Sequence, residues 1–241
     1  MPAITKVAAI GVNHWHSLYD AAYLLQLKEI PDAQLVALHD DDAAIAQERA
    51  SKVGNPPIYT DYPKMLAEVK PDFVIALGRH TEMAATAHYL LDRRIPFIME
   101  KPMGYDANEV RGVLDKARAT KGFAAVPLPY RHQAQTRLAR RLIAEGRLGP
   151  LSHICIRQMR PTSARYTQWG APWMLDPKIA NGGCLRNLGA HGLDLFMQLT
   201  GEAATVVGAQ VSTRGLNTAV EDYAAVMLRS AGGVVGNIEV S

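Results

Sequence analysis

The chain has few of the features that mark several large classes of protein. Its 241 residues include two cysteines, Cys155 and Cys184, which form no C-x-x-C motif and offer no disulfide framework. No apolar run is long enough to cross a membrane, and the first apolar stretch begins too close to Met1 to leave room for a signal peptide. We therefore expect a soluble cytoplasmic protein without a membrane partner.

A large excess of charge of one sign is also absent. The 26 lysines and arginines and the 23 acidic residues give a formal net charge of +3. The densest basic cluster consists of Arg137, Arg140, Arg141 and Arg147. Because these arginines lie around one amphipathic stretch, a solvated helix face is favoured over a nucleic-acid surface. No nucleic-acid partner is expected.

Apolar residues make up 48% of the chain, enough for a large core. In the first half, strand-like stretches such as residues 6–12 and 72–78 alternate with helix-like stretches such as 43–53 and 106–122. Strands that alternate with helices of this length predict an α/β fold with a doubly wound parallel sheet. We assign residues 1–125 to this domain.

The pattern changes after about residue 130. A helix is predicted over residues 184–199, and three strand patterns, 205–213, 222–230 and 234–241, close the chain. Strands gathered together in this way predict a second, α+β domain with an open sheet over residues 126–241. Because the chain stops inside a strand pattern, we expect this sheet to be incomplete at its C-terminus.

The stretch VAAIGVNHWHSLYD, residues 7–20, resembles a dinucleotide-binding loop with two of its glycines replaced. Gly11 stands at the tight turn, but Asn13 and His16 occupy the second and third glycine positions of G-x-G-x-x-G. Asparagine tolerates a left-handed backbone, so we predict one at position 13 and interpret residues 11–16, His14 included, as a variant nucleotide loop. A metal site at His14 and His16 is the alternative. The sequence shows no carboxylate near them, so no metal is expected.

Asp40 closes the second predicted strand, 24 positions after His16 (40 − 16). This separation fits the carboxylate that binds the ribose 2′-hydroxyl in dinucleotide-binding folds. Together with Asp41 and Asp42 it would repel a 2′-phosphate, which favours NAD over NADP as the cofactor. Helix capping is the alternative role, and Asp42 alone can satisfy it.

Two further loops follow buried strands at the edge where parallel sheets bind ligands. In the first, Gly78, Arg79 and His80 should lie beside the cofactor. Arg79 is equally compatible with a contact to pyrophosphate, a contact to an acidic substrate, or a solvent-facing position. In the second, Pro102 restricts the backbone beside Glu100 and Lys101, although a lone lysine at a strand end is usually only solvated.

Asn187 and His191 are spaced i, i+4 on the predicted helix, and Asp194 and Gln198 continue the same face. A histidine there can serve as a general base, although a single histidine on a polar face is more often a surface or capping residue.

Several segments resemble the Gfo/Idh/MocA family of NAD(P)-dependent oxidoreductases. They are the first strand with its turn, Asp40, PFIMEKPMG (96–104), LIAEGRLGPL (142–151) and WMLDPKIANGGCLRNLGAHGLDLFMQLTGE (173–202). The resemblance implies an N-terminal Rossmann domain and a second α/β domain with an open, mostly antiparallel sheet. It further implies a sugar-like small-molecule substrate, oxidation or reduction of a secondary alcohol, and a homo-oligomer in the full-length form.

The resemblance also implies roles for particular residues. Lys101 matches the family's lysine that orients the substrate hydroxyl, and His191 matches its histidine acid/base. Asn187 stands where many members have aspartate, and an amide cannot take up a proton. We take Lys101, His191 and Asn187 as catalytic candidates. The cofactor-binding candidates are Gly11, Asn13, His14, His16, Asp40, Gly78, Arg79, His80, Glu100 and Lys101.

Three functions fit these observations. The first is an NAD-dependent dehydrogenase in which His191 removes the hydroxyl proton and Lys101 stabilises the alkoxide. The second is a dinucleotide-binding sensor or regulatory subunit without turnover, which the atypical loop and Asn187 allow. The third is a hydrolase or lyase that uses NAD transiently.

Overall fold

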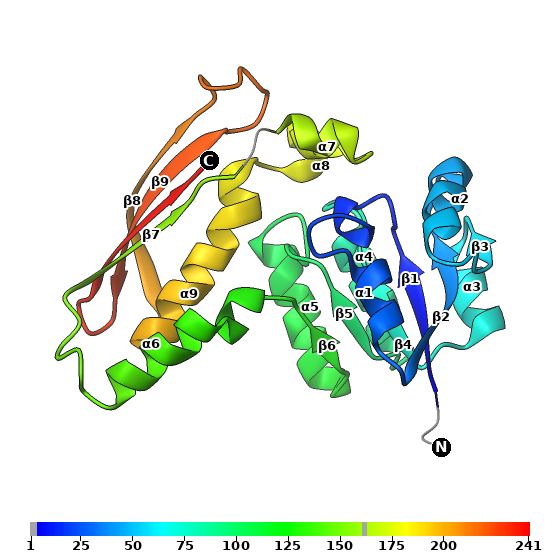
Figure 1. Cartoon of the computed structure of the whole chain (residues 1–241), viewed down its shortest axis with the longest axis horizontal. Coiled ribbons are helices and arrows are strands. Elements are labelled where there is room, and N and C mark those ends of the chain that lie inside the picture. Colours follow the sequence, from blue (N-terminus) through cyan, green and yellow to red (C-terminus); the bar gives the residue numbers. More distant parts are fainter. Residues whose placement is uncertain (1–3, 161–162) are drawn as a thin grey trace. The chain divides into compact units, whose positions relative to one another are not determined.

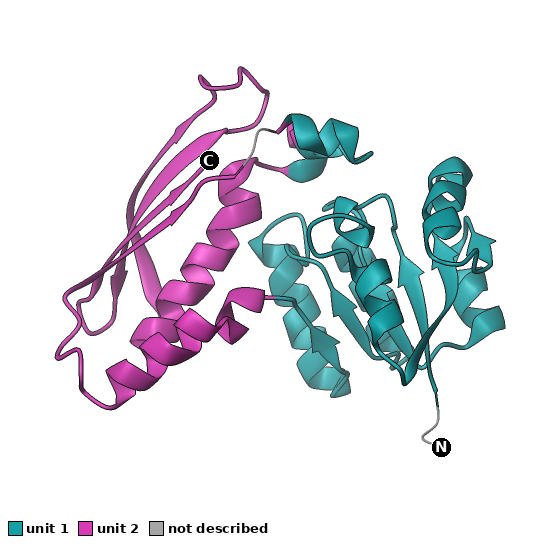
Figure 2. Ribbon diagram, viewed as in Figure 1, with its two compact units in different colours: residues 1–127, 164–174, 178–180 teal, residues 128–163, 175–177, 181–241 magenta. Residues whose placement is uncertain are grey.

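The structure is a computed structural model that describes residues 4–160 and 163–241. The described residues form two compact units, coloured teal and magenta in Figure 2. The first contains the chain up to Pro127 together with Ala164–Met174 and Lys178–Ala180. The second contains Leu128–Ser163, Leu175–Pro177 and Asn181–Ser241, less the two undescribed residues 161 and 162. Two short segments from the region that the sequence assigned to the second domain therefore pack on the first unit.

The first unit is built on a parallel sheet of six strands in the order β3-β2-β1-β4-β5-β6 (Figure 1). The strands are β1 (Thr5–Ile10), β2 (Ala33–His39), β3 (Ile58–Tyr59), β4 (Phe73–Ala76), β5 (Phe97–Met99) and β6 (Ala124–Ala125). This order is that of the dinucleotide-binding doubly wound fold, which confirms the predicted fold class. Its topological switch point lies between β1 and β4.

Helices cover both faces of this sheet. They are α1 (Tyr23–Gln26), α2 (Ala43–Lys52), α3 (Tyr62–Val69), α4 (Met83–Asp92) and α5 (Ala107–Thr120). Alternate residues of β1 enter two separate cores, because successive side chains of a strand point to opposite faces. Ala8 and Ile10 pack in the core that contains residues of α3, α4 and α5, whereas Val7 and Ala9 pack with residues of α1 and α2.

The segment after the nucleotide loop is not one continuous helix. It is divided into the 3₁₀ turn η1 (Trp15–Ser17), the single turn α1 and a second 3₁₀ turn η2 (Leu27–Glu29). Asp20 and Ala22 have left-handed φ angles of 54° and 46°. A continuous right-handed helix cannot pass through such residues, so it is interrupted between η1 and α1.

The second unit places helices on one face of a four-stranded sheet (Figure 1). The strands β7 (His153–Gln158), β8 (Ala204–Ser212), β9 (Tyr223–Ser230) and β10 (Val235–Val240) have the order β7-β10-β9-β8. Only the β7–β10 pair is parallel, and the other two pairs are antiparallel. This sheet confirms the predicted open, mostly antiparallel arrangement.

The core of the second unit lies between this sheet and α9 (Ala190–Thr200). Phe196 of α9 packs with Val226, Leu228 and Ile238 of the sheet. A second helix, α6 (Ala134–Ala144), lies next to α9 and follows the short turn η3 (Pro129–His132). Among the residues that the structure describes, no helix has the length and apolarity that crossing a membrane requires.

Gly11 provides a test of the close approach between β1 and β4. Its φ is +69°, and a Cβ atom added there would lie 2.5 Å from Cα of Gly78. Gly54 has a similar left-handed φ of +95° but has no atom within 4 Å of such a Cβ, so it is a matched control. We expect Gly11→Ala to lower the free energy of unfolding by about 1–3 kcal/mol more than Gly54→Ala, the usual cost of overpacking. Urea unfolding measures both, and equal losses would show that the two backbones can separate.

Candidate active site

The nucleotide loop begins at Gly11 and passes directly against Gly78, which follows β4. Neither residue has a Cβ, and both have left-handed φ angles, +69° and +99°. The missing side chains let the ends of β1 and β4 approach each other at the switch point, where this type of fold binds a pyrophosphate. Of the three glycine positions in the G-x-G-x-x-G pattern, the loop thus retains the first. There, a side chain would collide with the backbone of Gly78, just after β4.

Asn13 does not have the left-handed backbone that the sequence predicts, because it is absent from the residues with positive φ. Its side chain has a different role, which is to bind Asp40. Asn13 Nδ2 donates to Oδ2 of Asp40 at 2.8 Å, and its backbone N–H donates to the same oxygen at 2.6 Å. A side-chain bond, rather than glycine's conformational freedom, therefore fixes this part of the loop.

Asp40 is fully buried at the end of β2, and its two oxygens are engaged within the protein. Oδ2 accepts both Asn13 donors, and Oδ1 accepts the backbone N–H of Asp42 at 3.1 Å. Burial raises the pKa of Asp40, while these hydrogen bonds oppose the shift. The neighbouring Asp41 side chain is 65% exposed and presents a second carboxylate at the same strand end.

Glu100, at the end of β5, is the centre of a buried polar cluster. Its Oε1 accepts the hydroxyl of Tyr23 at 2.7 Å and the Nδ1–H of His16 at 2.8 Å. Its Oε2 accepts the backbone N–H of Lys101 at 2.9 Å. Burial alone would raise the pKa of Glu100, but the hydrogen bond and charge of His16 and the charge of Lys101 hold it well below its usual range. Tyr23 is not among the candidates predicted from the sequence. It lies far from Glu100 along the chain, so no local sequence pattern predicts their contact.

Lys101 is itself buried beside the nucleotide loop. Its side chain places Nζ 6.0 Å from the centroid of the Trp15 ring. The hydrogen bond from its backbone N–H to Glu100 holds it in place, and Pro102 follows it through a cis peptide bond. The structure thus brings the lysine candidate together with the loop candidates His14 and His16, in agreement with their placement at one edge of the sheet.

His14, His16 and Glu100 have potential ligand atoms within 4.8 Å of one another. The expectation of no metal rested on the lack of a nearby carboxylate, and that reason is therefore wrong. A second reason comes from the geometry: His14 Nδ1 accepts the backbone N–H of His16 at 3.1 Å. Burial, followed by the charge of His16, lowers the pKa of His14, which favours the neutral ring. The bond to His16 occupies one of the two nitrogens that His14 could offer to a metal.

A segment that we call the strap, Ala164–Met174 with Lys178–Ala180, covers the loop within the first unit. The Trp173 ring lies 5.8 Å from the His14 ring and 5.2 Å from the His80 ring. His80 is buried, and its Nδ1 lies 2.8 Å from the carbonyl oxygen of Ala180. His80, a cofactor-binding candidate, therefore contacts the strap at Trp173 and at Ala180.

Arg49 binds the strap at a second point, Trp169. From α2, its Nη2 donates to the carbonyl of Trp169 at 2.8 Å and its Nε to the carbonyl of Val12 at 3.3 Å. Trp169 in turn stacks on Tyr19, with ring centroids 5.3 Å apart. With Trp15 and Trp173, this places all three tryptophans of the chain at the loop and strap.

Arg79 lies at the β2 end of the site. Its Nη1 is 2.8 Å from Oε1 of Glu82 and 4.0 Å from Oδ2 of Asp41. Burial works against the charge on Arg79, but the hydrogen bond and charge of Glu82 outweigh it and raise the pKa of Arg79. Of the roles that the sequence left open, a free solvent-facing arginine is excluded by these contacts.

The second unit carries the other catalytic candidates. The regular helix predicted over residues 184–199 instead begins as a π-helical turn, Leu185–Gly189, and continues as α9. Asn187 lies in the π turn and His191 in the first turn of α9, and both are buried. Such π turns occur often at functional sites, because they shift the side chains that follow relative to those before.

The sequence analysis missed two contacts between η3 and α9. The Tyr130 ring of η3 stacks on the imidazole, with centroids 4.9 Å apart and planes at 26°. The next residue, Arg131, forms a forked ion pair with Asp194, whose side chain is 5% exposed. No local pattern in the sequence predicts that residues 130 and 131 face α9.

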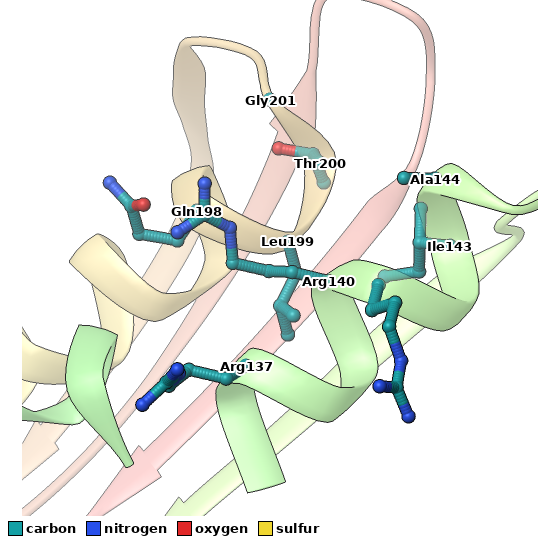
Figure 3. A pocket seen from close by; sticks show the side chains of 9 residues that line it. Arg137, Arg140, Ile143, Ala144, Gln198, Leu199, Thr200 and Gly201 are labelled. Atoms are coloured by element: carbon teal, nitrogen blue, oxygen red, sulfur yellow. The ribbon is translucent and has the colours of Figure 1, made fainter. Parts of the chain in front are cut away.

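The arginine cluster on α6 lies at the surface of the second unit (Figure 3). Arg137, Arg140 and Arg141 are exposed and border a shallow groove that is also lined by Thr200, the last residue of α9, and by Gly201 after it. Arg141 lies 3.9 Å from Glu145 on the same helix. These are the features of a solvated helix face.

Comparison with known families identifies the chain. Residues 5–127, more than half of it, match the oxidoreductase family with an NAD-binding Rossmann fold, GFO_IDH_MocA. Residues 136–241 match the GFO/IDH/MocA C-terminal domain. The chain belongs to the Gfo/Idh/MocA oxidoreductase family. The resemblance drawn from its motifs is confirmed, and the first unit is an NAD-binding Rossmann domain.

Relatives with known names are distant and longer. The D-glucoside 3-dehydrogenase of Escherichia coli is 28% identical over 202 residues, which cover 81% of this chain and 54% of the relative. The trans-1,2-dihydrobenzene-1,2-diol dehydrogenase of Sus scrofa is 28% identical over 92% of this chain and 64% of its own length. The chain thus spans between half and two thirds of these two relatives.

Solved structures share the fold. The WlbA dehydrogenase of Bordetella pertussis, crystallised with NADH and UDP-GlcNAcA, superimposes with a TM-score of 0.87 at 20% identity. The match covers all of this chain and 70% of that one. It shows the fold of both units.

Asn13 allows a direct test of the bond to Asp40. Because its backbone is not left-handed, alanine fits there without strain, so Asn13→Ala removes only the amide. We expect the free energy of unfolding to fall by about 1–3 kcal/mol, since the buried carboxylate loses a donor. The matched control is Asn108→Ala, which replaces an exposed asparagine on α5. Urea unfolding midpoints that agree for Asn13→Ala and the unaltered chain would contradict the assignment.

His14 gives the stability of the protein a defined pH dependence. Burial lowers its pKa in the folded chain, whereas in the unfolded chain its pKa is near the ordinary 6.5. As the pH falls below about 6.5, the unfolded chain binds a proton that the folded chain does not. The free energy of unfolding should therefore decrease by up to about 1.4 kcal/mol per pH unit for this residue. Burial gives His39 a shift in the same direction.

The measurement is urea unfolding between pH 7.5 and pH 5. His14→Gln should make the dependence shallower, since glutamine can still accept the N–H of His16 but does not titrate. His153→Gln, which alters an exposed histidine on β7, is the matched control. A slope that is identical in His14→Gln and the unaltered chain would contradict a neutral, buried His14.

Proposed function

We propose that this chain acts as an NAD-dependent dehydrogenase or reductase on a secondary alcohol of a sugar, polyol or related small molecule. The observation that carries the proposal is the buried Lys101 at the end of β5, held by Glu100 beside the nucleotide loop of an NAD-binding Rossmann domain. The names of the two dehydrogenase relatives, which act on a glucoside and a dihydrodiol, support an alcohol substrate.

The residues present fit the cofactor. We propose that the pyrophosphate binds at the tight turn of Gly11, beside Gly78 at the switch point of the sheet. The carboxylates at residues 40–42 lie where β2 ends, at the ribose position of this fold. We propose that Asp40 fixes the loop and that Asp41, which is exposed, faces the ribose and disfavours a 2′-phosphate. NAD is then preferred to NADP. Bound NAD⁺ supplies the hydride acceptor.

The chain's own residues then handle the proton and the developing charge. In alcohol oxidation, His191 would accept the proton of the substrate hydroxyl and become an imidazolium, while bound NAD⁺ would supply the acceptor for the two electrons and the hydrogen lost by the same carbon, which becomes a ketone. The Lys101 ammonium donates to the substrate oxygen and stabilises the negative charge that forms on it. Asn187 can hydrogen-bond but cannot carry the proton away, so we propose that His191 releases it to solvent.

One observation favours a second function. The amide of Asn187, at a position where many family members have a carboxylate, is compatible with a dinucleotide-binding sensor that lacks turnover. This function requires NAD binding but neither Lys101 nor His191. The two functions therefore differ in what these residues contribute.

Replacement of His191 and Lys101 tests the catalytic proposal. We expect His191→Ala to lower kcat by about 10²–10⁴-fold, the usual loss of a general base, and to leave NAD⁺ affinity unchanged. Lys101→Met should lower kcat and raise KM for the alcohol. Absorbance of NADH over a panel of sugars and polyols measures turnover, and fluorescence of the three tryptophans at the loop and strap measures cofactor binding. Unchanged turnover in His191→Ala, with intact NAD⁺ binding, would favour the sensor.

A further inference from the structure

Two adjacent residues of η3 face two residues of α9. Tyr130 stacks on His191, and Arg131 binds Asp194, which follows His191 by three positions on the same helix. Because residues three apart on a helix lie on one face, the two contacts are neighbours. The second unit thus has a two-point contact between a short turn and the segment that carries the proposed acid/base.

The turn η3 has little stability of its own. It spans four residues, Pro129–His132, and 3₁₀ turns of this length have poor hydrogen-bond geometry. Its end is closed by a backbone bond of 3.4 Å from Gln133 to Tyr130. The orientation of Tyr130 therefore depends on what holds η3 against α9.

The geometry of the contact between Arg131 and Asp194 restricts the orientation of η3 on α9. Arg131 Nε donates to both carboxylate oxygens at 2.9 Å, and Nη2 donates to Oδ1 at 2.5 Å. A planar guanidinium that forks onto a carboxylate restricts both distance and angle, which a single ammonium contact does not. Asp194 is buried and Arg131 is half-exposed, so the pair is anchored on the α9 side.

We propose that Arg131 and Asp194 are positioning residues for His191. The forked ion pair fixes η3 on α9, η3 places the Tyr130 ring flat on one face of the imidazole, and the imidazole keeps a single orientation toward its substrate. This inference rests on the proposed function of His191 as the acid/base. Catalysis requires that orientation, because a displacement of about 1 Å can cost about 10²-fold in rate.

The first test replaces the fork by a single charge. Arg131→Lys retains the positive charge beside Asp194 but loses the planar, two-point contact. We expect kcat to fall by about 10–10²-fold while KM for NAD⁺ is unchanged, because the cofactor site belongs to the other unit. The control is Arg157→Lys, which makes the same replacement in an arginine–carboxylate pair that is not forked, between β7 and β10, where Arg157 Nε lies 2.7 Å from Glu239. It should leave kcat unchanged.

A spectroscopic readout separates positioning from stability. A ring stacked on His191 shifts the carbon-bound imidazole protons upfield in the NMR spectrum, and His191→Gln identifies those signals. We expect Arg131→Lys and Tyr130→Leu to remove the upfield shift, and Tyr130→Phe, which keeps the ring, to retain both the shift and the rate. A purely structural ion pair would alter the unfolding midpoint without moving these signals.

The outcomes distinguish the two proposals. If His191→Ala is inactive but Arg131→Lys retains full kcat and the upfield shift, the positioning role is overturned and the proposed function stands. An equal loss of kcat in Arg157→Lys would also overturn it. If His191→Ala turns over normally, the proposed function fails, and the positioning role fails with it, whatever the NMR signals show.

Discussion

A buried carboxylate, Glu100, is the constraint on which the site of the first unit depends. An ionised carboxylate away from water costs several kcal/mol unless donors surround it, so its partners are obligatory. Those partners come from three places: His16 in the nucleotide loop, Tyr23 in the first helix, and the backbone of Lys101. One charge therefore fixes the loop, the helix behind it and the lysine proposed to act on substrate.

The same principle explains how the nucleotide loop departs from the three-glycine pattern. Where the second glycine would stand, Asn13 is bonded to Asp40, and where the third would stand, His16 is bonded to Glu100. Glycines let such a loop adopt a tight path through backbone freedom. Here, two buried carboxylates at the ends of β2 and β5 hold the path through side-chain bonds. Only Gly11, where a Cβ would meet the backbone of Gly78, has no substitute.

Periodicity and capping were sufficient to predict most of the fold. Asp42 and Asp106 cap α2 and α5, and Gly201 ends α9 with a left-handed φ, each as their sequence positions indicate. These features depend on residues a few positions apart. The bond between His16 and Glu100 joins residues 84 positions apart, and the strap joins residue 173 to residue 14. No local pattern carries such contacts, so the sequence identified the candidates but not what holds them.

The two catalytic candidates are supported in the same way, although they lie in different units. Lys101 is placed by the buried Glu100, and the buried Asp194 binds the arginine that follows the ring stacked on His191. In each case the carboxylate is charge-compensated by partners from elsewhere in the chain. It therefore sets geometry without leaving a free negative charge beside the reacting group. An amide at position 187 likewise adds no negative charge. In the second unit too, the carboxylate near His191 therefore contributes geometry rather than a net charge.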